Sequence, residues 1–285
     1  MKRNIILLIC IILIMNCFCG SDNNKPKIQQ DARSLSSNNK SKESLNTKSI
    51  KKIITPKDYK FTVIKTYPHP KKGFTQGFVW HNGYLYEGTG IVGQSYIRKI
   101  DLESNRILQE RKLEGNLFGE GIAILKNKIY ELTWTSNTCL VWDLESFNLI
   151  TSFTYSGEGW GITTDGENLI VSDGTDIIRY FSPDDFNLIR TIKVTEEGNS
   201  IDKINELEYI DSKIWANIWM EDKIIIIDPA SGLVTGRIDI HSLRKYLKPS
   251  DEADVLNGIA WDSISHKLYI TGKEWPFIFE VKVNL

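Results

Sequence analysis

The sequence predicts an all-β protein, specifically a five-bladed β-propeller, from three observations. Short runs rich in Ile, Val, Tyr and Trp alternate with turn signals every 8 to 12 residues from Tyr59 to Leu285, without a long helical period. One strand–turn–strand segment recurs five times along this stretch. The last recurrence lacks a strand that the start of the folded part can supply.

The recurring segment consists of an apolar strand, a turn containing Gly or a polar residue, and a second strand. A third strand, a polar turn and a fourth strand follow each of the first four segments. Equivalent positions are 44, 40, 45 and 54 residues apart, which is typical of propeller blades of four strands each. The segments are "GFVWHNGYLYEGTG", "GIAILKNKIYELTW", "GITTDGENLIVSDG", "ELEYIDSKIWANIW" and "GIAWDSISHKLYITGK", aligned on Leu85, Ile129, Leu169, Ile214 and Leu268.

The fifth blade ends after its third strand, "FIFEVKV", where the chain stops. The stretch "YKFTVIKTYP" (59–68) precedes the first repeat in the way that the fourth strands precede the others. We therefore expect this N-terminal strand to complete the last blade, which would close the ring and leave no open sheet between blades. A β-sandwich is the alternative architecture, but it would not require the repeat.

Residues 1–19 have the pattern of an export signal, with a charged start followed by eleven unbroken apolar residues ending at Met15. Eleven apolar residues are too few to span a bilayer. A cysteine directly after them indicates lipoprotein processing, and Cys17 fits better than Cys19 because the asparagine before it is smaller than phenylalanine. We expect an exported bacterial protein, lipid-anchored to a membrane on its periplasmic or surface side. A plain secretory signal and an uncleaved anchor are the alternatives.

The composition changes again after the signal. Residues 20–57 are rich in Ser, Asn and Lys and nearly free of aromatics, so they predict a flexible tether to a propeller domain at 58–285. The domain carries 24 basic and 33 acidic residues, a net charge of −9, which argues against nucleic acid as a partner. Its single cysteine, Cys139, excludes an internal disulfide. A closed ring predicts a monomer.

Equivalent positions of the repeats form rings around the propeller axis, and two of these rings fall on the same face of the disc. One consists of the residues just before each first strand, the other of those just after each second strand. Together they bring amides, one carboxylate, three tryptophans and one lysine to one mouth of the axis. The first ring is Gln76, Glu120, Trp160, Asn205 and Asn257, and the second is Gly90, Trp134, Gly174, Trp219 and Lys273.

Each of these residue types also has a structural interpretation. A polar residue at the start of a strand often caps backbone groups in a turn, and this alternative stays open for Glu120. Tryptophans in strands usually belong to the core, and we expect this of Trp80, Trp142 and Trp261. The three tryptophans of the rings flank strands, so core packing explains them less well.

Several motifs of other functional classes fail. The stretch "GTGIVG" (88–93) matches a dinucleotide fingerprint, but alternating strand character follows where a helix would be needed. The four histidines are scattered and no cysteine pair supplements them, so no metal or cofactor is predicted. There is no G-x-S-x-G nucleophile. These absences leave acid–base chemistry by a single carboxylate as the simplest mechanism.

The motifs "FTQGF", "FGEGIA", "LTW", "EGWGI", "INELEYI", "WANIW", "LNGIAW" and "TGKEWP" resemble those of the plant-type (type I) glutaminyl-peptide cyclotransferases, or glutaminyl cyclases. The resemblance covers residues 60–285 in order. It implies a five-bladed propeller that converts the N-terminal glutamine of peptides and proteins to pyroglutamate with release of ammonia, without a catalytic zinc. The signal and tether lie outside the resemblance.

The resemblance also implies roles for individual residues. The acid of "FGEG", Glu120, corresponds to the catalytic carboxylate of the family. The substrate-binding residues would be Gln76, Phe118, Trp134, Trp160, Asn205, Trp219 and Lys273.

The expected chemistry suits these residues. The substrate's α-amine attacks its own γ-carbonyl, so the enzyme mainly has to hold the folded conformer. Glu120 would move the proton from the amine to the leaving amide, and burial among tryptophans should raise its pKa while Lys273 lowers it. Asn205 and Gln76 would bind the γ-amide. Two alternatives remain: a membrane-tethered propeller that binds peptide without catalysis, and a five-bladed glycosidase. The latter normally needs two carboxylates, and only second-tier candidates such as Asp173 accompany Glu120.

Overall fold

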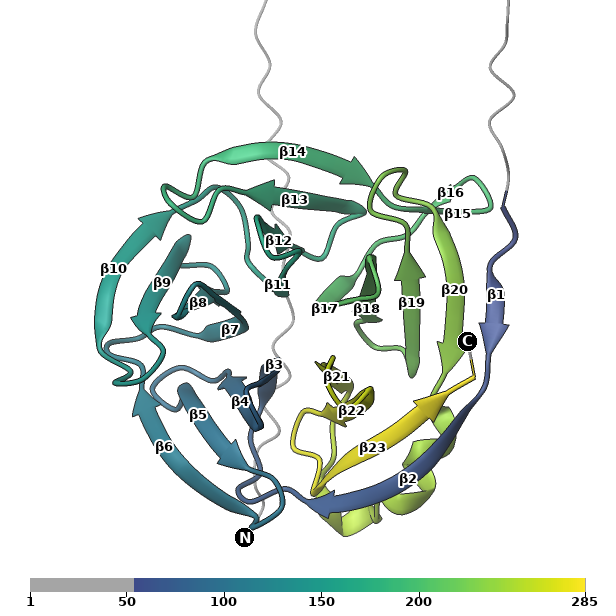
Figure 1. The fold of residues 1–285 in the computed structure, drawn as a ribbon, viewed down its shortest axis with the longest axis horizontal. Helices are drawn as coiled ribbons and strands as arrows, with labels where there is room; N and C mark the ends of the chain where they lie inside the picture. The colour runs from purple at the N-terminus through teal and green to yellow at the C-terminus, as the bar shows by residue number, and fades with distance from the viewer. Residues whose placement is uncertain (1–53, 285) are drawn as a thin grey trace, which may run out of the picture. The chain divides into compact units, whose positions relative to one another are not determined.

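A computed structural model describes residues 54–284, which form five sheets arranged radially around one axis (Figure 1). The predicted signal 1–19, Cys17 and residues 20–53 of the predicted tether lie outside the described residues. The five-bladed propeller predicted from the repeats is confirmed. In each blade the first strand of the repeat lies nearest the axis and the fourth lies at the rim (Figure 1).

The first four blades follow the predicted order of strands. Blade 1 contains β3 (Thr75–His81), β4 (Tyr84–Thr89), β5 (Tyr96–Asp101) and β6 (Arg106–Lys112). Blade 2 contains β7 (Gly119–Leu125), β8 (Lys128–Thr133), β9 (Thr138–Asp143) and β10 (Leu149–Thr154). Blade 3 contains β11 (Ile162–Thr164), β12 (Leu169–Val171), β13 (Ile177–Phe181) and β14 (Leu188–Lys193). Blade 4 contains β17 (Ile204–Ile210), β18 (Lys213–Ile218), β19 (Lys223–Ile227) and β20 (Val234–Asp239).

Blade 5 is closed as predicted. It contains β21 (Leu256–Asp262), β22 (Lys267–Gly272) and β23 (Phe277–Val283), and its fourth strand is β2 (Phe61–Pro68) from the other end of the domain. The pairing of β2 with β23 is antiparallel, so strands from the two ends of the described domain hold the ring closed. A short strand, β1 (Lys57–Tyr59), pairs in parallel with β20 and gives blade 4 a fifth strand. Lys57, the last residue of the predicted tether, therefore belongs to a strand of blade 4.

The core is divided among the interfaces between blades. Five clusters of buried apolar side chains occur, one between each pair of neighbouring blades. This distribution follows from the alternation of side chains along each strand, because both faces of a blade meet a neighbour. Trp142 is buried as predicted, but Trp80 and Trp261 are only half-buried. Both nevertheless pack against the core clusters on either side of blade 5, so the prediction that they belong to the core holds in part.

Four of the five innermost strands are irregular at their first residues. The register against the second strand shifts between Thr75 and Gly77 in blade 1, and corresponding shifts occur in blades 2, 4 and 5. A β-bulge inserts a residue that is not paired in the ladder and redirects its side chain. These four bulges coincide with the predicted ring of polar residues, namely Gln76, Glu120, Asn205 and Asn257.

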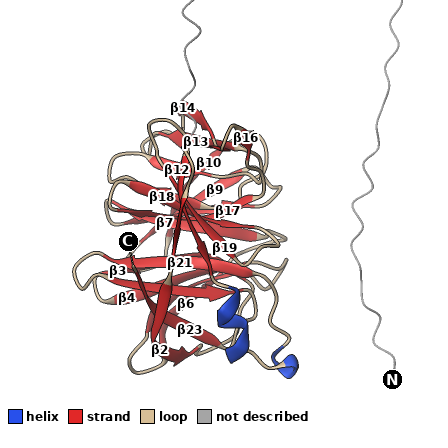
Figure 2. Ribbon diagram, turned by 90° about the vertical axis from the view of Figure 1, so that its right-hand side faces the viewer, coloured by secondary structure: helices blue, strands red, loops and turns tan. Residues whose placement is uncertain are grey.

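The remaining elements are short. A two-stranded hairpin is formed by β15 (Thr195–Glu196) and β16 (Asn199–Ser200), and two 3-10 helices, η1 (His241–Tyr246) and η2 (Pro249–Asp251), precede blade 5 (blue in Figure 2). None of the helices in residues 54–284 is long and apolar enough to cross a membrane.

Candidate active site

Glu120 lies in the bulge at the start of β7, and backbone contacts to both neighbouring blades fix its position. The N–H of Gly119 donates to Ser95 Oγ in blade 1 (3.0 Å), and the N–H of Gly121 donates to the carbonyl of Trp160 before blade 3 (2.8 Å). The Glu120 side chain is buried, with 5% of its surface exposed. A turn-capping role does not describe this carboxyl, because its hydrogen-bonded partner is a side chain.

That partner is Gln76, at the equivalent bulge of blade 1. Gln76 Nε2 donates to Glu120 Oε1 (3.1 Å), and Asn257 Nδ2 of blade 5 donates to Gln76 Oε1 (3.2 Å) and to the carbonyl of Thr75 (2.9 Å). Amides of blades 1 and 5 thus form one chain that orients the Glu120 carboxyl of blade 2. Asn257 belongs to the predicted ring, but the sequence assigns no role to it. Binding of substrate by Gln76 stays a prediction.

The electrostatic surroundings favour an uncharged Glu120. Burial raises its pKa well above the ordinary range of a glutamate, the charge of Lys273 lowers it, and the charge of Glu158 raises it. Burial also lowers the pKa of Lys273, against the opposing effect of Glu120 and Asp254. For both groups the loss of hydration outweighs their mutual attraction. Within residues 54–284, Glu120 forms no ion pair.

Aromatic side chains follow one another around the same mouth. We call them the aromatic arc, which comprises Phe74, Phe118, Trp134, Trp160 and Trp219. Ring centroids are 6.2 Å apart for Phe74 and Phe118, 5.6 Å for Phe118 and Trp134, and 5.7 Å for Trp160 and Trp219. At its first end, Lys273 Nζ lies 4.6 Å from the ring centre of Phe74. Phe74 was missed from sequence, although it precedes Gln76 by two residues in "FTQG".

The gap in the middle of the arc is bridged by Glu158. Its Oε2 accepts hydrogen bonds from the indole Nε1 of Trp134 (2.7 Å) and of Trp160 (2.8 Å). Sequence reasoning also missed this residue, which lies two positions before Trp160 in "EGWG".

Two ring positions hold glycine because an aromatic ring occupies the space beside them. A Cβ on Gly90 would lie 2.5 Å from the ring of Phe118, and one on Gly174 would lie 2.7 Å from the indole of Trp160. Gly174 also has a φ of +80°, which L-residues adopt with strain. Larger residues at these two positions would displace the arc.

Asn205 occupies the ring position of blade 4. Its side chain is buried, and its Oδ1 has no hydrogen-bond partner among the described residues. Its backbone carbonyl accepts from Ser172 Oγ (2.6 Å), which ties it to blade 3. A buried acceptor without a partner is costly unless something binds it, so this oxygen is available to an N–H donor of a ligand.

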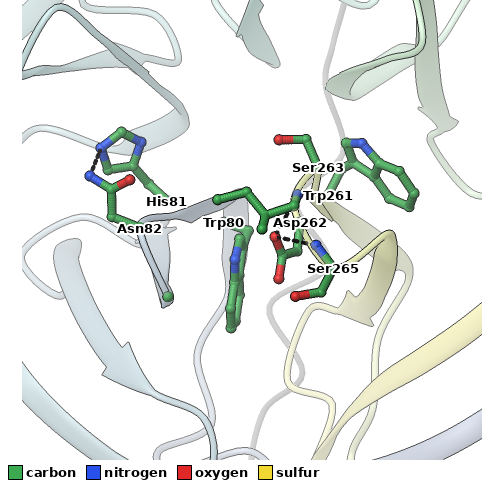
Figure 3. Close-up of a pocket in the computed structure, with 9 residues that line it drawn as sticks. Trp80, His81, Asn82, Trp261, Asp262, Ser263 and Ser265 are labelled. Atoms are coloured by element: carbon green, nitrogen blue, oxygen red, sulfur yellow. Dashed lines mark hydrogen bonds between the residues drawn. The ribbon is translucent and has the colours of Figure 1, made fainter.

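A pocket of about 290 Å³ lies at the opposite ends of the inner strands of blades 1 and 5 (Figure 3). It is lined in part by Trp80 and His81 at the end of β3 and by Trp261 and Asp262 at the end of β21. Asp262 Oδ1 accepts backbone N–H bonds from its own turn. None of the site residues predicted from sequence lines this pocket. The one carboxylate in its lining, Asp262, is held by the hydrogen bonds of its own turn.

Asp173, the candidate second carboxylate of the glycosidase alternative, is also held by contacts within the protein. Asp173 accepts hydrogen bonds from Thr175 and pairs with Arg179 at 3.4 Å. No group of three or more His, Cys, Asp or Glu side chains suited to a metal occurs in residues 54–284, and independence from metal stays a prediction.

Comparisons with known proteins bear on this constellation. A profile of the family described as glutamine cyclotransferase matches residues 35–283. The chain belongs to this family. It is 36% identical over 232 residues to the glutaminyl-peptide cyclotransferase of Arabidopsis thaliana, which covers 78% of this chain and 71% of the relative. The crystal structure of Myxococcus xanthus glutaminyl cyclase superimposes with a TM-score of 0.74 at 38% identity, covering 80% of this chain and 98% of the other.

Membership of the glutamine cyclotransferase family confirms the resemblance seen in the motifs. The propeller is thus the scaffold of an enzyme family, which removes the support for a binding propeller without catalysis and for a glycosidase. The roles of the individual residues are not decided by these comparisons and depend on the geometry described above.

Proposed function

We propose that this cyclotransferase closes the N-terminal glutamine of peptides and proteins to pyroglutamate with Glu120 as its proton-transfer residue. Family membership supports the reaction. The observation that carries the residue assignment is the buried carboxyl of Glu120, the one acid among the ring residues, which is oriented by Gln76.

The reaction needs two proton movements at neighbouring nitrogens. As the α-amine attacks the γ-carbonyl, the new C–N bond makes the amine nitrogen acidic, and the ionised Glu120 accepts its proton. The carboxyl then gives this proton to the γ-amide nitrogen as the second C–N bond breaks and ammonia leaves. Burial raises the pKa of Glu120 above the ordinary range of a glutamate, which strengthens it as an acceptor of the amine proton, and the same carboxyl returns that proton to the leaving nitrogen. Proton transfer of this kind contributes about 10² to 10⁴ in rate.

The other residues bind and orient the substrate. The γ-oxygen becomes negative in the tetrahedral intermediate, and we assign the side-chain N–H of Asn205 and the ammonium of Lys273, both buried, as its donors. The tryptophans of the aromatic arc would surround the folded glutamine side chain and exclude water, which keeps the amine close to the carbonyl. No metal or cofactor takes part in this scheme.

The test uses the purified protein and a peptide with N-terminal glutamine. Ammonia release is followed by a coupled assay, and mass spectrometry checks that the peptide has lost one ammonia. A peptide with N-terminal asparagine serves as the control, because it would need a smaller ring. Absence of turnover by the folded protein would contradict the proposal.

The cellular setting is proposed from the sequence alone. The enzyme would be exported, cleaved before Cys17, lipidated there and held at the membrane by residues 20–57, acting as a monomer. Incorporation of labelled palmitate into the wild type, lost on Cys17→Ser but not on Cys19→Ser, would support this setting. Light scattering of the solubilised protein would test its oligomeric state.

A further inference from the structure

The carboxylate of Glu158 binds two tryptophans of the aromatic arc, and the proposed reaction gives this contact no role. One oxygen, Oε2, accepts from two indole N–H groups at 2.7 Å and 2.8 Å. Both distances lie at the short end for N–H···O bonds and are typical of charge-assisted bonds. The two indoles belong to Trp134, which follows β8 of blade 2, and Trp160, which precedes β11 of blade 3.

The backbone that carries Glu158 is itself held in place. Arg179 donates from Nη1 to the carbonyl of Ser156 (2.6 Å) and from Nη2 to the carbonyl of Glu158 (2.8 Å). The N–H of Gly159 donates to the carbonyl of Trp134 (3.1 Å). Any side chain at Gly159 would collide with the hydroxyl of Tyr155. The backbone of residues 156–159 is thus held by contacts that do not depend on the hydrogen bonds from Glu158 to the indoles.

Trp134 packs against Phe118, and Trp160 packs against Trp219 and Gly174, but these contacts lie in separate halves of the aromatic arc. Both indoles are half-buried, and among residues 54–284 no ring-to-ring contact joins the two halves, whereas Glu158 binds one indole from each. Residues 158–159 make two hydrogen bonds to Trp134, one to its backbone carbonyl and one to its indole nitrogen. An indole whose N–H is anchored cannot rotate freely about its side-chain torsions, which lowers the conformational entropy lost when a ligand binds against it.

We infer that Glu158 is a positioning residue that locks Trp134 and Trp160 in the orientation required to hold the folded glutamine substrate. This inference rests on the proposed function for its kinetic consequence but not for its structural one. Glu158 acts through the two indoles and need not contact the reacting atoms. It also adds a negative charge near Glu120, whose other charged neighbour is Lys273.

Two substitutions separate the hydrogen bonds from the charge. Glu158→Gln keeps an oxygen acceptor and removes the charge, whereas Glu158→Ala removes both. We expect Glu158→Ala to raise KM about tenfold with kcat within about threefold, because a charge-assisted clamp on two rings is lost. Glu158→Gln should keep KM within about threefold of the wild type, since neutral acceptors are weaker but present. In both variants the acid limb of the pH–rate profile should move to lower pH, because the charge that raises the pKa of Glu120 is gone.

A spectroscopic measurement tests the clamp without substrate. The chain has eight tryptophans, so the indole region of a ¹H–¹⁵N spectrum contains eight side-chain signals. Two of them should lie downfield in the wild type and move upfield on Glu158→Ala, with smaller shifts on Glu158→Gln. Trp134→Phe and Trp160→Phe assign them. Glu167→Gln removes an exposed charge from the same blade and should change neither the spectrum nor the kinetics.

The outcomes separate the inference from the proposed reaction. If the indole signals move in Glu158→Ala but KM is unchanged, the positioning role is wrong, and Glu158 only stabilises the contact between blades 2 and 3. Indole signals that stay in place on Glu158→Ala would overturn the clamp itself. A protein that shows the indole shifts but turns over no glutaminyl peptide would contradict the proposed function while upholding the clamp.

Discussion

Replacing Glu120 by glutamine is the sharpest perturbation of the site. The amide is nearly the same size as the carboxyl, and its oxygen can still accept the hydrogen bond from Gln76 Nε2, now 3.1 Å from Glu120 Oε1. The substitution also removes a group whose burial disfavours its charge. The variant should therefore fold, with a melting temperature no lower than that of the wild type near neutral pH.

The expected effect is confined to turnover. A neutral amide cannot take a proton from the attacking amine and pass it to the leaving nitrogen. The rate should fall by about 10² to 10⁴, which corresponds to about 3 to 5 kcal/mol in activation free energy. Binding should change little, because the contacts of Glu120 to the protein persist and the aromatic arc is untouched. We expect kcat to fall while KM stays within about threefold.

Ammonia release and peptide affinity, measured on the same preparations, check this expectation. Glu131→Gln is the matched control, since Glu131 is also a buried glutamate of blade 2 but its Oε2 accepts from Trp142 Nε1 (2.9 Å), outside the ring of polar residues that contains Glu120. A folded Glu120→Gln variant that retains turnover within tenfold of the wild type would refute Glu120 as the proton carrier. An equal loss in Glu131→Gln would show that removing any buried acid from blade 2 has the same effect.

Three further predictions follow from the described residues. Gly174→Ala should destabilise the fold by about 1 to 2 kcal/mol, because of its φ of +80°, and should raise KM by displacing Trp160. Gly166→Ala, at a φ of +94° with open space around it, should lower stability and leave KM unchanged. Chemical denaturation and steady-state kinetics of the two variants measure these effects. Burial raises the pKa of Glu131 from 4.5 to about 8, so the folded state holds a proton that the unfolded state has lost. Its contribution to stability is complete below the unfolded pKa and disappears as pH rises through about 8. Glu208, whose pKa is also raised to about 8, remains in both proteins, so urea titrations from pH 5 to 9 should show a decline in both that is larger in the wild type than in Glu131→Gln, by on the order of 4 kcal/mol. Turnover should survive prolonged chelator treatment, and a loss restored by added metal would contradict the proposed chemistry.

The fold was predictable because the repeat imposes it. Four periods of similar length place equivalent residues in equivalent strands, and a blade without its last strand needs one from elsewhere in the chain. The strand β1 could not be found in this way. Its three residues, Lys57–Tyr59, have no strand pattern of their own, and their pairing depends on the free edge of β20.

The site was predictable as far as equivalence between repeats extends. That argument found Glu120 and its amide partner Gln76, because both occupy bulges at the same place in their blades. It missed Phe74 and Glu158, whose contributions depend on the direction of a side chain and not on the repeat position. The signal that could have revealed Glu158 is an acid two residues before Trp160 in a segment whose glycines already marked it as constrained.

The choice of an amide as the partner of Glu120 follows from what the carboxyl has to do. An arginine or lysine in direct contact would hold the carboxyl ionised and lower its pKa, which would make it a poor donor to the departing nitrogen. Gln76 orients the carboxyl through one neutral N–H, and it is itself oriented by Asn257. Lys273 acts on Glu120 as a charge without an ion pair between them, and its effect is opposed by burial and by Glu158. The carboxyl is therefore fixed in direction but not in protonation state, which is the condition for accepting a proton from one nitrogen and returning it to the next.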